Sequence, residues 1–327
     1  TKGLPVLPAT QPDTTANLGI PQIDLEPRTL PPKARWWQLP DNIEMPKRDF
    51  ESYSSLDAYI HSPYQWLLKY AARIRPGSLA AVNDGPLLKG NLAHSLFEQY
   101  FNENGDIQSI KPSSIPDWVD QHTPVLLQRE GALLLEPGRQ AECERFVTVL
   151  QDALVVLVEH LQQAGVVSVA MELHGEGLYT GGKLTGSIDL LATTGEGREA
   201  VVDMKWGGKN FRRDSLREGS DLQLATYAQL RLAAGAESYP VLSYFIVSDS
   251  HMLNLAHSYV PRAESIAPDT GENTAQFWER FQHTWRWRKQ QFDAGLIEIT
   301  VEGTELTDNS SPGEAGLPMP DASDTFN

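Results

Sequence analysis

The sequence is nearly devoid of cysteine, because its 327 residues contain only Cys143. A single thiol excludes a disulfide within the chain, a cysteine-rich zinc site and an iron–sulfur cluster held by four cysteines of the chain. Long apolar runs are also missing, and the first residues, TKGLPVLPATQPD, lack a basic segment followed by an apolar one. These absences predict a soluble, cytoplasmic protein with no membrane span. Because the first residue is Thr rather than Met, we expect a processed chain or a segment of a larger one.

Basic residues are scarce as well: 27 Lys and Arg against 43 Asp and Glu give a formal net charge of −16. This balance argues against a generally basic nucleic-acid binder. The acids are unevenly distributed, since residues 302–327 contain six of them and no Lys or Arg. The basic residues gather in two groups, Lys205, Lys209, Arg212, Arg213 and Arg217, and Arg280, Arg286, Arg288 and Lys289. Each group is either a solvated face or a binding surface.

Composition divides the chain into three parts. Residues 1–48 hold nine of the 22 prolines and no sustained periodicity, which predicts an extended leader or linker docked by Trp36 and Trp37. Residues 49–300 carry the apolar periodicity of a folded domain, and a hydrophobic content of 40% is enough for a core. Residues 301–327 form an acidic tail rich in Ser, Pro and Gly, which we expect to be disordered.

The stretch from Gly182 to Trp206 reads GKLTGSIDLLATTGEGREAVVDMKW. Two apolar runs flank the turn-like TGEGR, which predicts a β-hairpin. Each strand carries one acid, Asp189 or Asp203, and Lys205 points to the same side of its strand as Asp203. If the strands pair about the turn, two carboxylates and one ammonium surround one point. Two buried like charges are unfavourable without a cation, so a divalent metal is the candidate ligand. The alternative is that each Asp is a cap or turn partner.

Helices and a further strand are predicted before this hairpin. Apolar residues at helical spacing predict helices near residues 86–104 and 138–163. His94 lies off the centre of the first apolar stripe, so it is either a ligand or a packed or surface histidine. The run VVSVAMELH predicts a strand that carries Glu172. That acid either supports the metal site or forms a cross-strand pair.

After the hairpin we expect a basic loop and then a helix in SDLQLATYAQLRLAAG. Ser220 or Asp221 can cap this helix, and Gln223 and Tyr227 share one of its faces because they are four residues apart. The run YPVLSYFIVS predicts another strand. A final amphipathic helix over residues 273–294 carries an aromatic stripe that we assign to the core.

Four short motifs follow one another along the chain. They are G-x-x-x-H from Gly90 to His94, G-x-x-D from Gly186 to Asp189, D-x-K from Asp203 to Lys205, and Q-x-x-x-Y from Gln223 to Tyr227. Their order and spacing resemble the RecB-type nucleases of the PD-(D/E)XK superfamily, including the AddB-like C-terminal nuclease domains of AddAB-type DNA-end-processing complexes. The resemblance implies an α/β fold with a mixed central β-sheet flanked by helices and an N-terminal helical region. Iron–sulfur members carry a Cys where this chain has Ser62, so no iron–sulfur cluster is expected.

The resemblance also implies roles for the motif residues. The implied ligands, for Mg²⁺ or Mn²⁺, are His94, Asp189, Asp203 and the main-chain carbonyl of Met204. The implied catalytic residues are Lys205, Asp203, Asp189, Gln223 and Tyr227. Lys205 would orient the attacking water and stabilise the charge on the phosphate, a requirement of phosphodiester hydrolysis in general.

These expectations combine into a metal-dependent DNA nuclease that is part of a larger repair, recombination or phage-defence machine. The basic residues expected to contact DNA are Lys209, Arg212, Arg213 and Arg217. A helicase-like or other protein partner, or a larger parent chain, would deliver the strand. The alternative is a non-catalytic DNA-holding or protein-docking module on the same fold.

Overall fold

A computed structural model describes residues 35–40, 43, 45, 48–74, 84–256, 260, 262–299 and 311–319 of the chain. All of these residues belong to one unit, Arg35–Asn327. Residues 1–34 of the expected leader and most of the expected acidic tail lie outside the described residues. Within the described ranges, no helix combines the length and the apolar character that a membrane crossing requires.

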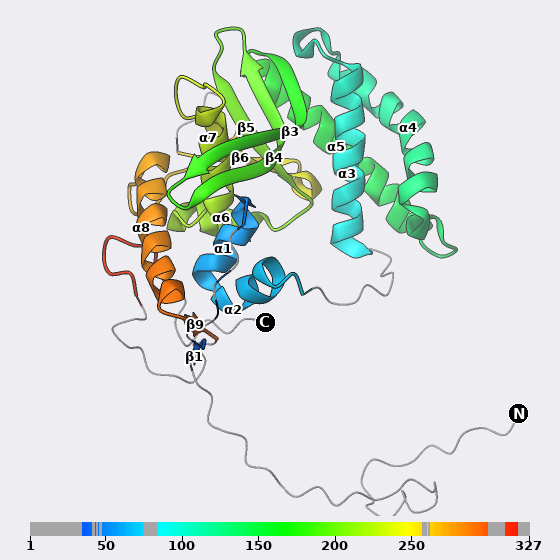
Figure 1. Ribbon diagram of the computed structural model, residues 1–327. Coiled ribbons are helices and arrows are strands. Elements are labelled where there is room, and N and C mark those ends of the chain that lie inside the picture. The colour runs from blue at the N-terminus through cyan, green and yellow to red at the C-terminus, as the bar shows by residue number, and fades with distance from the viewer. Residues whose placement is uncertain are drawn as a thin grey trace, which may run out of the picture. The chain divides into compact units, whose positions relative to one another are not determined.

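A mixed seven-stranded sheet lies at the centre of this unit (Figure 1). Its strands are β2 (Phe50–Glu51), β3 (Val166–Tyr179), β4 (Gly182–Thr194), β5 (Glu199–Lys205), β6 (Val241–Ile246), β7 (His251–Leu255) and β8 (Glu264–Ile266). The order is β2-β4-β5-β6-β7-β8, and β3 pairs with β4 as well. The pairs β2–β4, β5–β6 and β7–β8 are parallel, whereas the others are antiparallel. The predicted hairpin is therefore the β4–β5 pair.

Helices cover both faces of the sheet, so the predicted α/β class is confirmed. They are α1 (Tyr53–His61), α2 (Pro63–Trp66), α3 (Gly85–Glu103), α4 (Ile115–Glu130), α5 (Gln140–Gln163), α6 (Lys209–Glu218), α7 (Leu222–Ala233) and α8 (Thr274–Asp293). One apolar cluster joins α3, α4 and α5 to one face, and a second joins α1, α2, α7 and α8 to the other. In Figure 1, α3 to α5 lie to the right of the sheet and α8 lies to its left.

The alternation of side chains along β5 decides which of them pack against the helices α3 to α5 and which pack against α7 and α8. Ala200, Val202 and Met204 belong to the apolar cluster of α3 to α5, whereas Val201 belongs to the cluster of α7 and α8. Because side chains alternate along a strand, Asp203 and Lys205 lie on the α7 side with Val201. Local sequence thus places the acid and the base of the D-x-K motif on the α7 side of the sheet.

The segment from Lys209 to Glu218, which was expected to be a basic loop, is the helix α6. Its sequence, KNFRRDSLRE, has no apolar stripe, and Leu216 is its only buried residue. Helical periodicity is therefore absent from the sequence pattern. The helix begins after Gly208 and ends before Gly219, which both have positive φ, at 85° and 65°. Glycine adopts that conformation without the steric strain a side chain would add.

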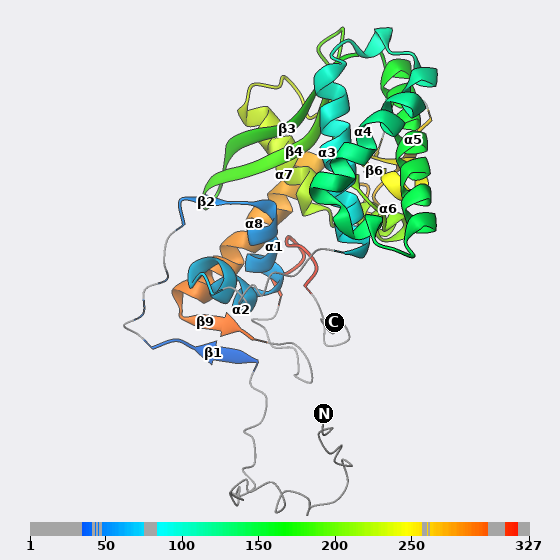
Figure 2. The ribbon, with the colours of Figure 1, turned by 90° about the vertical axis from the view of Figure 1, so that its right-hand side faces the viewer.

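The second basic group, which comprises Arg280, Arg286, Arg288 and Lys289, includes one buried residue. Arg288 of α8 is 1% exposed, and its guanidinium lies 2.7 Å from the main-chain carbonyl of Ile60 and 2.9 Å from Glu298. Arg35 pairs with the other carboxylate oxygen of Glu298 at 2.6 Å. These ion pairs join α8 and α1 to a two-stranded sheet made of β1 (Trp36–Gln38) and β9 (Leu296–Glu298), seen below α2 in Figure 2. Arg288 is therefore a core residue and not part of a solvated face.

Both tryptophans that were expected to dock the leader lie in β1. Trp37 stands opposite Ile297 of β9, and its ring meets the ring of Tyr64 edge-on at a centroid distance of 6.4 Å. Trp37 nevertheless keeps 41% of its surface exposed. Strand β1 thus begins within the range expected for the leader and packs on the N-terminal helical region.

Candidate active site

Strands β4 and β5 separate where their two acids lie. Main-chain pairing between them stops at Leu190 and Val202. Beyond that point the N–H of Met204 donates to Oδ2 of Asp189 at 2.8 Å, and the carbonyl of Met204 accepts from Nε2 of His94 at 2.9 Å. Because buried main-chain groups need partners, these two side chains satisfy Met204 where the neighbouring strand no longer can.

His94, Asp189 and Glu172 form a compact group of possible metal ligands. One ligand atom from each lies within 4.8 Å of the others. Nε2 of His94 is 3.7 Å from Asp189, and its Nδ1 is 3.5 Å from Glu172. Together with the Met204 carbonyl, the group offers two carboxylates, one imidazole and one carbonyl oxygen. An oxygen-rich set with one imidazole suits Mg²⁺ and Mn²⁺, so these residues fit the implied metal.

Glu172 enters this group through an unusual backbone conformation. Its φ is 47°, which is rare for a residue with a side chain. Its carboxylate accepts from the hydroxyl of Ser187 on β4 at 3.1 Å as well as meeting His94. Both alternatives for Glu172 therefore occur together: it is a cross-strand partner and a neighbour of the candidate ligands.

Asp203 lies beside this group but turns its oxygens toward α7 and Lys205. Its side chain is fully buried, with Oδ2 at 2.5 Å from Nζ of Lys205. Oδ1 accepts from Nε2 of Gln223 at 2.6 Å, and the same nitrogen donates to the hydroxyl of Tyr227 at 3.0 Å. Gln223 and Tyr227 share a face of α7, as their four-residue spacing predicts, and in the structure Gln223 contacts Asp203 directly and Lys205 only through that carboxylate. Lys205 keeps 25% of its side chain exposed, so it can meet a substrate.

Burial and like charge perturb both acids of the hairpin. Burial raises the pKa of Asp203 to about 7, and the charge of Asp189 adds to the rise. Burial also raises the pKa of Asp189, although the charges of His94 and Lys205 act against it. Burial alone lowers the pKa of His94, but the hydrogen bond to Glu172 and the charge of Asp189 outweigh it and raise that pKa. The site therefore holds more negative charge than its own cations offset, which favours an added cation.

Glycine in the G-x-x-D motif lets α7 approach the sheet. A Cβ at Gly186 would lie 3.1 Å from Leu230 and 3.4 Å from the ring of Tyr227. Gly175 stands opposite Gly186 on β3, and a Cβ there would lie 3.2 Å from Leu230. The close packing carries Tyr227 and Gln223 to the acids. At Gly90, by contrast, a Cβ would lie 3.6 Å from the Cβ of Trp206, which is ordinary contact.

The four residues expected to bind DNA all lie on α6, which begins four residues after Lys205. Three of them have acidic partners: Lys209 pairs with Asp249, Arg213 with Glu264, and Arg217 with Asp214. Arg212 instead lies over two aromatic rings, those of Phe211 and Tyr244, at 5.1 and 5.0 Å. The four cations therefore differ in their availability to a ligand.

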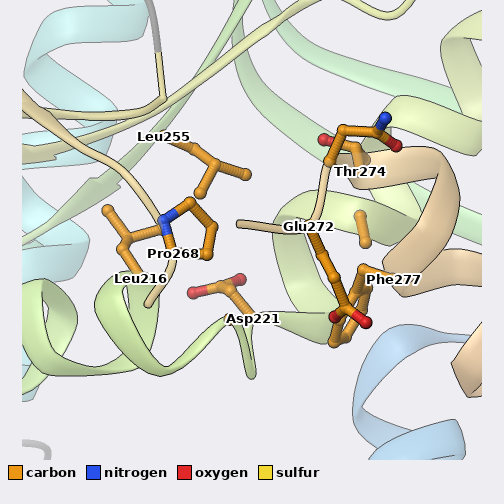
Figure 3. Close-up of a pocket in the computed structure, with 10 residues that line it drawn as sticks. Leu216, Asp221, Leu255, Pro268, Glu272, Thr274 and Phe277 are labelled. Atoms are coloured by element: carbon orange, nitrogen blue, oxygen red, sulfur yellow. The ribbon is translucent and has the colours of Figure 1, made fainter. Parts of the chain in front are cut away.

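A small pocket near the start of α7 is separate from this chemistry (Figure 3). Leu216, Asp221, Pro268 and Phe277 are among the residues that line it. Its volume of about 20 Å³ suits roughly one water molecule. Asp221 is already engaged there, because it caps α7 through the N–H of Leu224 and accepts from the hydroxyl of Tyr244 at 2.7 Å. The pocket is thus too small for a substrate.

The fold, the D-x-K strand and the positioning Gln together define a nuclease core. The chain belongs to the PD-(D/E)XK nuclease superfamily, whose family model matches residues 51–302. One relative, from Clostridium novyi (strain NT), is a subunit of an ATP-dependent helicase/deoxyribonuclease and is 23% identical over 197 residues. The match covers 53% of this chain and 17% of that protein, so most of the relative has no counterpart here. The resemblance drawn from the four motifs is confirmed.

Proposed function

We propose that this protein is a Mg²⁺- or Mn²⁺-dependent deoxyribonuclease that hydrolyses phosphodiester bonds. The observation that carries the proposal is the convergence of His94, Asp189 and the Met204 carbonyl beside the Asp203–Lys205 pair. Such a set combines cation ligands with a partly exposed ammonium. Phosphodiester hydrolysis needs both.

The proposed ligands of the metal are His94, Asp189, the Met204 carbonyl and Asp203, with Glu172 beside them. A bound divalent metal supplies a Lewis acid that polarises a phosphoryl oxygen and lowers the pKa of water. Asp203 is a suitable ligand because its carboxylate is buried next to Asp189 with only one ammonium to offset two charges. Glu172 holds Nδ1 of His94, which leaves Nε2 facing Asp189 and Met204.

The chain's own residues supply the remaining steps of the proposed reaction. The ammonium of Lys205 donates hydrogen bonds to the attacking water and to the phosphate, and it stabilises the negative charge that grows on the phosphate. Gln223 holds the carboxylate of Asp203, which in turn holds Lys205. The same Gln223 nitrogen also donates to the hydroxyl of Tyr227, which helps to fix the amide. The ammonium is therefore preorganised before the substrate arrives.

The proposal extends to the setting in which the nuclease acts. The relative from Clostridium novyi is named as a subunit of a helicase/deoxyribonuclease. We propose that the present chain likewise acts on DNA in the cytoplasm with a helicase-like partner or within a larger chain, in repair, recombination or phage defence. The acidic balance of the sequence supports this view, since a net charge of −16 makes unaided capture of DNA weak.

The test is a cleavage assay on end-labelled linear DNA and on closed circular DNA, each with Mg²⁺, Mn²⁺ or EDTA. We expect cleavage with either metal and none with EDTA. Loss of linear DNA alone would identify an exonuclease, whereas nicked circles would identify an endonuclease. A folded protein that binds DNA but cuts neither form with either metal would be the DNA-holding module instead.

A further inference from the structure

Arg212 differs from the other cations of α6. Lys209, Arg213 and Arg217 each have an acidic partner, and Arg213 forms two hydrogen bonds of 2.7 Å with Glu264. For Arg212 the described part of the chain offers aromatic rings and no carboxylate. A guanidinium without an anionic partner keeps its five N–H donors available to a ligand.

The position of Arg212 relates it directly to the D-x-K motif. Its guanidinium carbon lies 5.0 Å from the centroid of the Tyr244 ring. Tyr244 of β6 is the register partner of Asp203 across the parallel β5–β6 pair. Two residues further along the same pair of strands, Lys205 stands opposite Ile246. Register partners point to the same face of a sheet. Arg212 therefore lies over the α7 face of the sheet beside Asp203.

Tyr53, the first residue of α1, approaches the same place from another element. Its ring meets that of Tyr227 edge-on at a centroid distance of 6.4 Å. Tyr227 is joined to Asp203 through the amide of Gln223. The hydroxyl of Tyr53 donates to no described residue, and the side chain is half-buried, so the hydroxyl is available to a ligand.

Electrostatics agree with this placement. Burial raises the pKa of Tyr53, the charges of Lys205 and Arg212 act to lower it, and the charges of Asp203 and Asp221 act to raise it. Both cations are thus close enough to the phenol to influence it. Groups from β5, α6 and α1 thus lie near one another with hydrogen-bond donors and two positive charges, while the nearby acids are already engaged, Asp203 by Lys205 and Asp221 by Tyr244. A phosphodiester, which has only acceptors and one negative charge, is the complementary ligand.

We propose that Tyr53 and Arg212 form a phosphate-binding subsite next to Lys205 for the DNA strand. This subsite rests on the proposed function and deepens it, because it assigns the substrate contact to one cation of α6 and adds a tyrosine from α1. Arg213 then serves mainly to hold α6 against Glu264 of β8, whereas Arg217 pairs with Asp214 within α6 itself. Arg212 anchors the phosphate with its charge, and Tyr53 adds a neutral hydrogen bond.

The test is binding of a fluorescein-labelled single-stranded oligodeoxynucleotide, measured by anisotropy in EDTA over a series of NaCl concentrations. Loss of one phosphate contact in Arg212→Ala should lower the slope of log affinity against log salt by about 0.7. Tyr53→Phe should keep the slope and weaken binding about tenfold, because it removes a hydrogen bond to a charged group. Arg145→Ala and Tyr239→Phe, exposed residues on α5 and after α7, are the matched controls and should behave as wild type.

An unchanged slope in Arg212→Ala, or unchanged affinity in Tyr53→Phe, overturns the subsite. If Arg212→Ala does not fold, Arg212→Lys decides: it should keep the slope and lose affinity, since an ammonium lacks the forked donors. Wild-type affinity in Arg212→Lys would then contradict the proposal. Mn²⁺ titration by calorimetry should be the same for all variants. Normal binding without any cleavage by the wild type would refute the nuclease and leave the subsite standing.

Discussion

Two clusters of buried charge in this chain differ in how fully their charges are offset. Arg288 is 1% exposed, yet its guanidinium has oxygen acceptors from Ile60, Gln291 and Glu298. Asp203 is 0% exposed and lies next to the charge of a second acid, and among the described residues Lys205 is its only cation at salt-bridge distance. The first arrangement stabilises the fold, whereas the second is strained until something else binds.

The difference gives a rule for separating the two roles. A buried ion whose partners are complete serves packing, and its removal should damage stability and leave the chemistry intact. A buried ion with incomplete compensation serves the substrate or a cofactor, and its removal should damage the chemistry and spare stability. Four mutants test this distinction, beginning with the largest effect.

Removal of the Lys205 ammonium, the partner of Asp203, should have the largest effect. We expect Lys205→Ala to lower the cleavage rate by about 10²-fold or more, since it removes a preorganised charge from the transition state. The readout is the initial rate on labelled DNA at saturating Mg²⁺. Lys183→Ala, on β4 beside the ring of Phe50, is the control. A folded Lys205→Ala protein that cuts at the wild-type rate would remove the D-x-K motif from the active site.

Removal of the Arg288 guanidinium, whose acceptors are all in place, should lower the stability of the fold and leave the cleavage chemistry unaffected. We expect Arg288→Ala to lower the free energy of unfolding by about 3–5 kcal/mol, because Glu298 and the Ile60 carbonyl lose a buried partner. The neighbouring Lys289→Ala breaks only an exposed pair with Asp293, so a change of about 0–1 kcal/mol is expected. Urea denaturation measures both. Equal losses in the two variants would contradict the structural role of the buried cluster.

Loss of the imidazole should weaken metal binding. We expect His94→Ala to lower Mn²⁺ affinity about tenfold or more, whereas His174→Ala, which is exposed on β3, should not change it. The imidazole must be neutral to bind a metal, and its pKa is raised by Glu172 and Asp189 against the effect of burial. Affinity should therefore begin to fall at a pH above the usual 6.5 as the solution is acidified. Calorimetric titration that finds wild-type affinity in His94→Ala would make His94 a packing residue.

The smallest effect is a gain of stability. The pKa of Asp203 is raised by burial to about 7, so the ionised carboxylate destabilises the metal-free fold above that pH and has no such effect below about pH 4. We expect Asp203→Asn in EDTA to be more stable than wild type at pH 8 by on the order of 1 kcal/mol, and equal to it near pH 4. Lys205 loses its partner, which offsets part of the gain.

Thermal melts with and without Mn²⁺ measure this effect, with Asp152→Asn on an exposed position of α5 as the control. Mn²⁺ should stabilise the wild type and have less effect on Asp203→Asn. A mutant that is less stable than wild type at pH 8 would place Asp203 in the same class as Arg288.

Much of the site follows from local sequence because it depends on short-range periodicity. Two-residue alternation places Asp203 with Lys205, and four-residue spacing places Gln223 with Tyr227, as the structure confirms. The hairpin follows from its turn residues, and α3 and α5 follow from their apolar stripes.

Other features depend on contacts that no local pattern carries. Strands β1, β2, β8 and β9 have two or three residues each, too few to show alternation. Helix α6 was expected to be a loop because its surface is charged on nearly every side. Glu172 joins the ligands only through a positive φ, and Tyr53 only through the packing of α1 on α7. The sequence therefore left the role of Glu172 open between the metal site and a cross-strand pair, and it did not single out Tyr53, because tertiary structure alone decides both positions.

The separation of β4 from β5 has a consequence for reading mutational data. Position 204 contributes through its main-chain carbonyl, which every amino acid possesses, while the Met204 side chain packs among α3 and α5. A saturation scan would therefore rank this position by the size and polarity of the substituent and would report a core residue. Only a change in the peptide itself, such as an ester bond between residues 204 and 205 that weakens the carbonyl as an acceptor, could expose its second role.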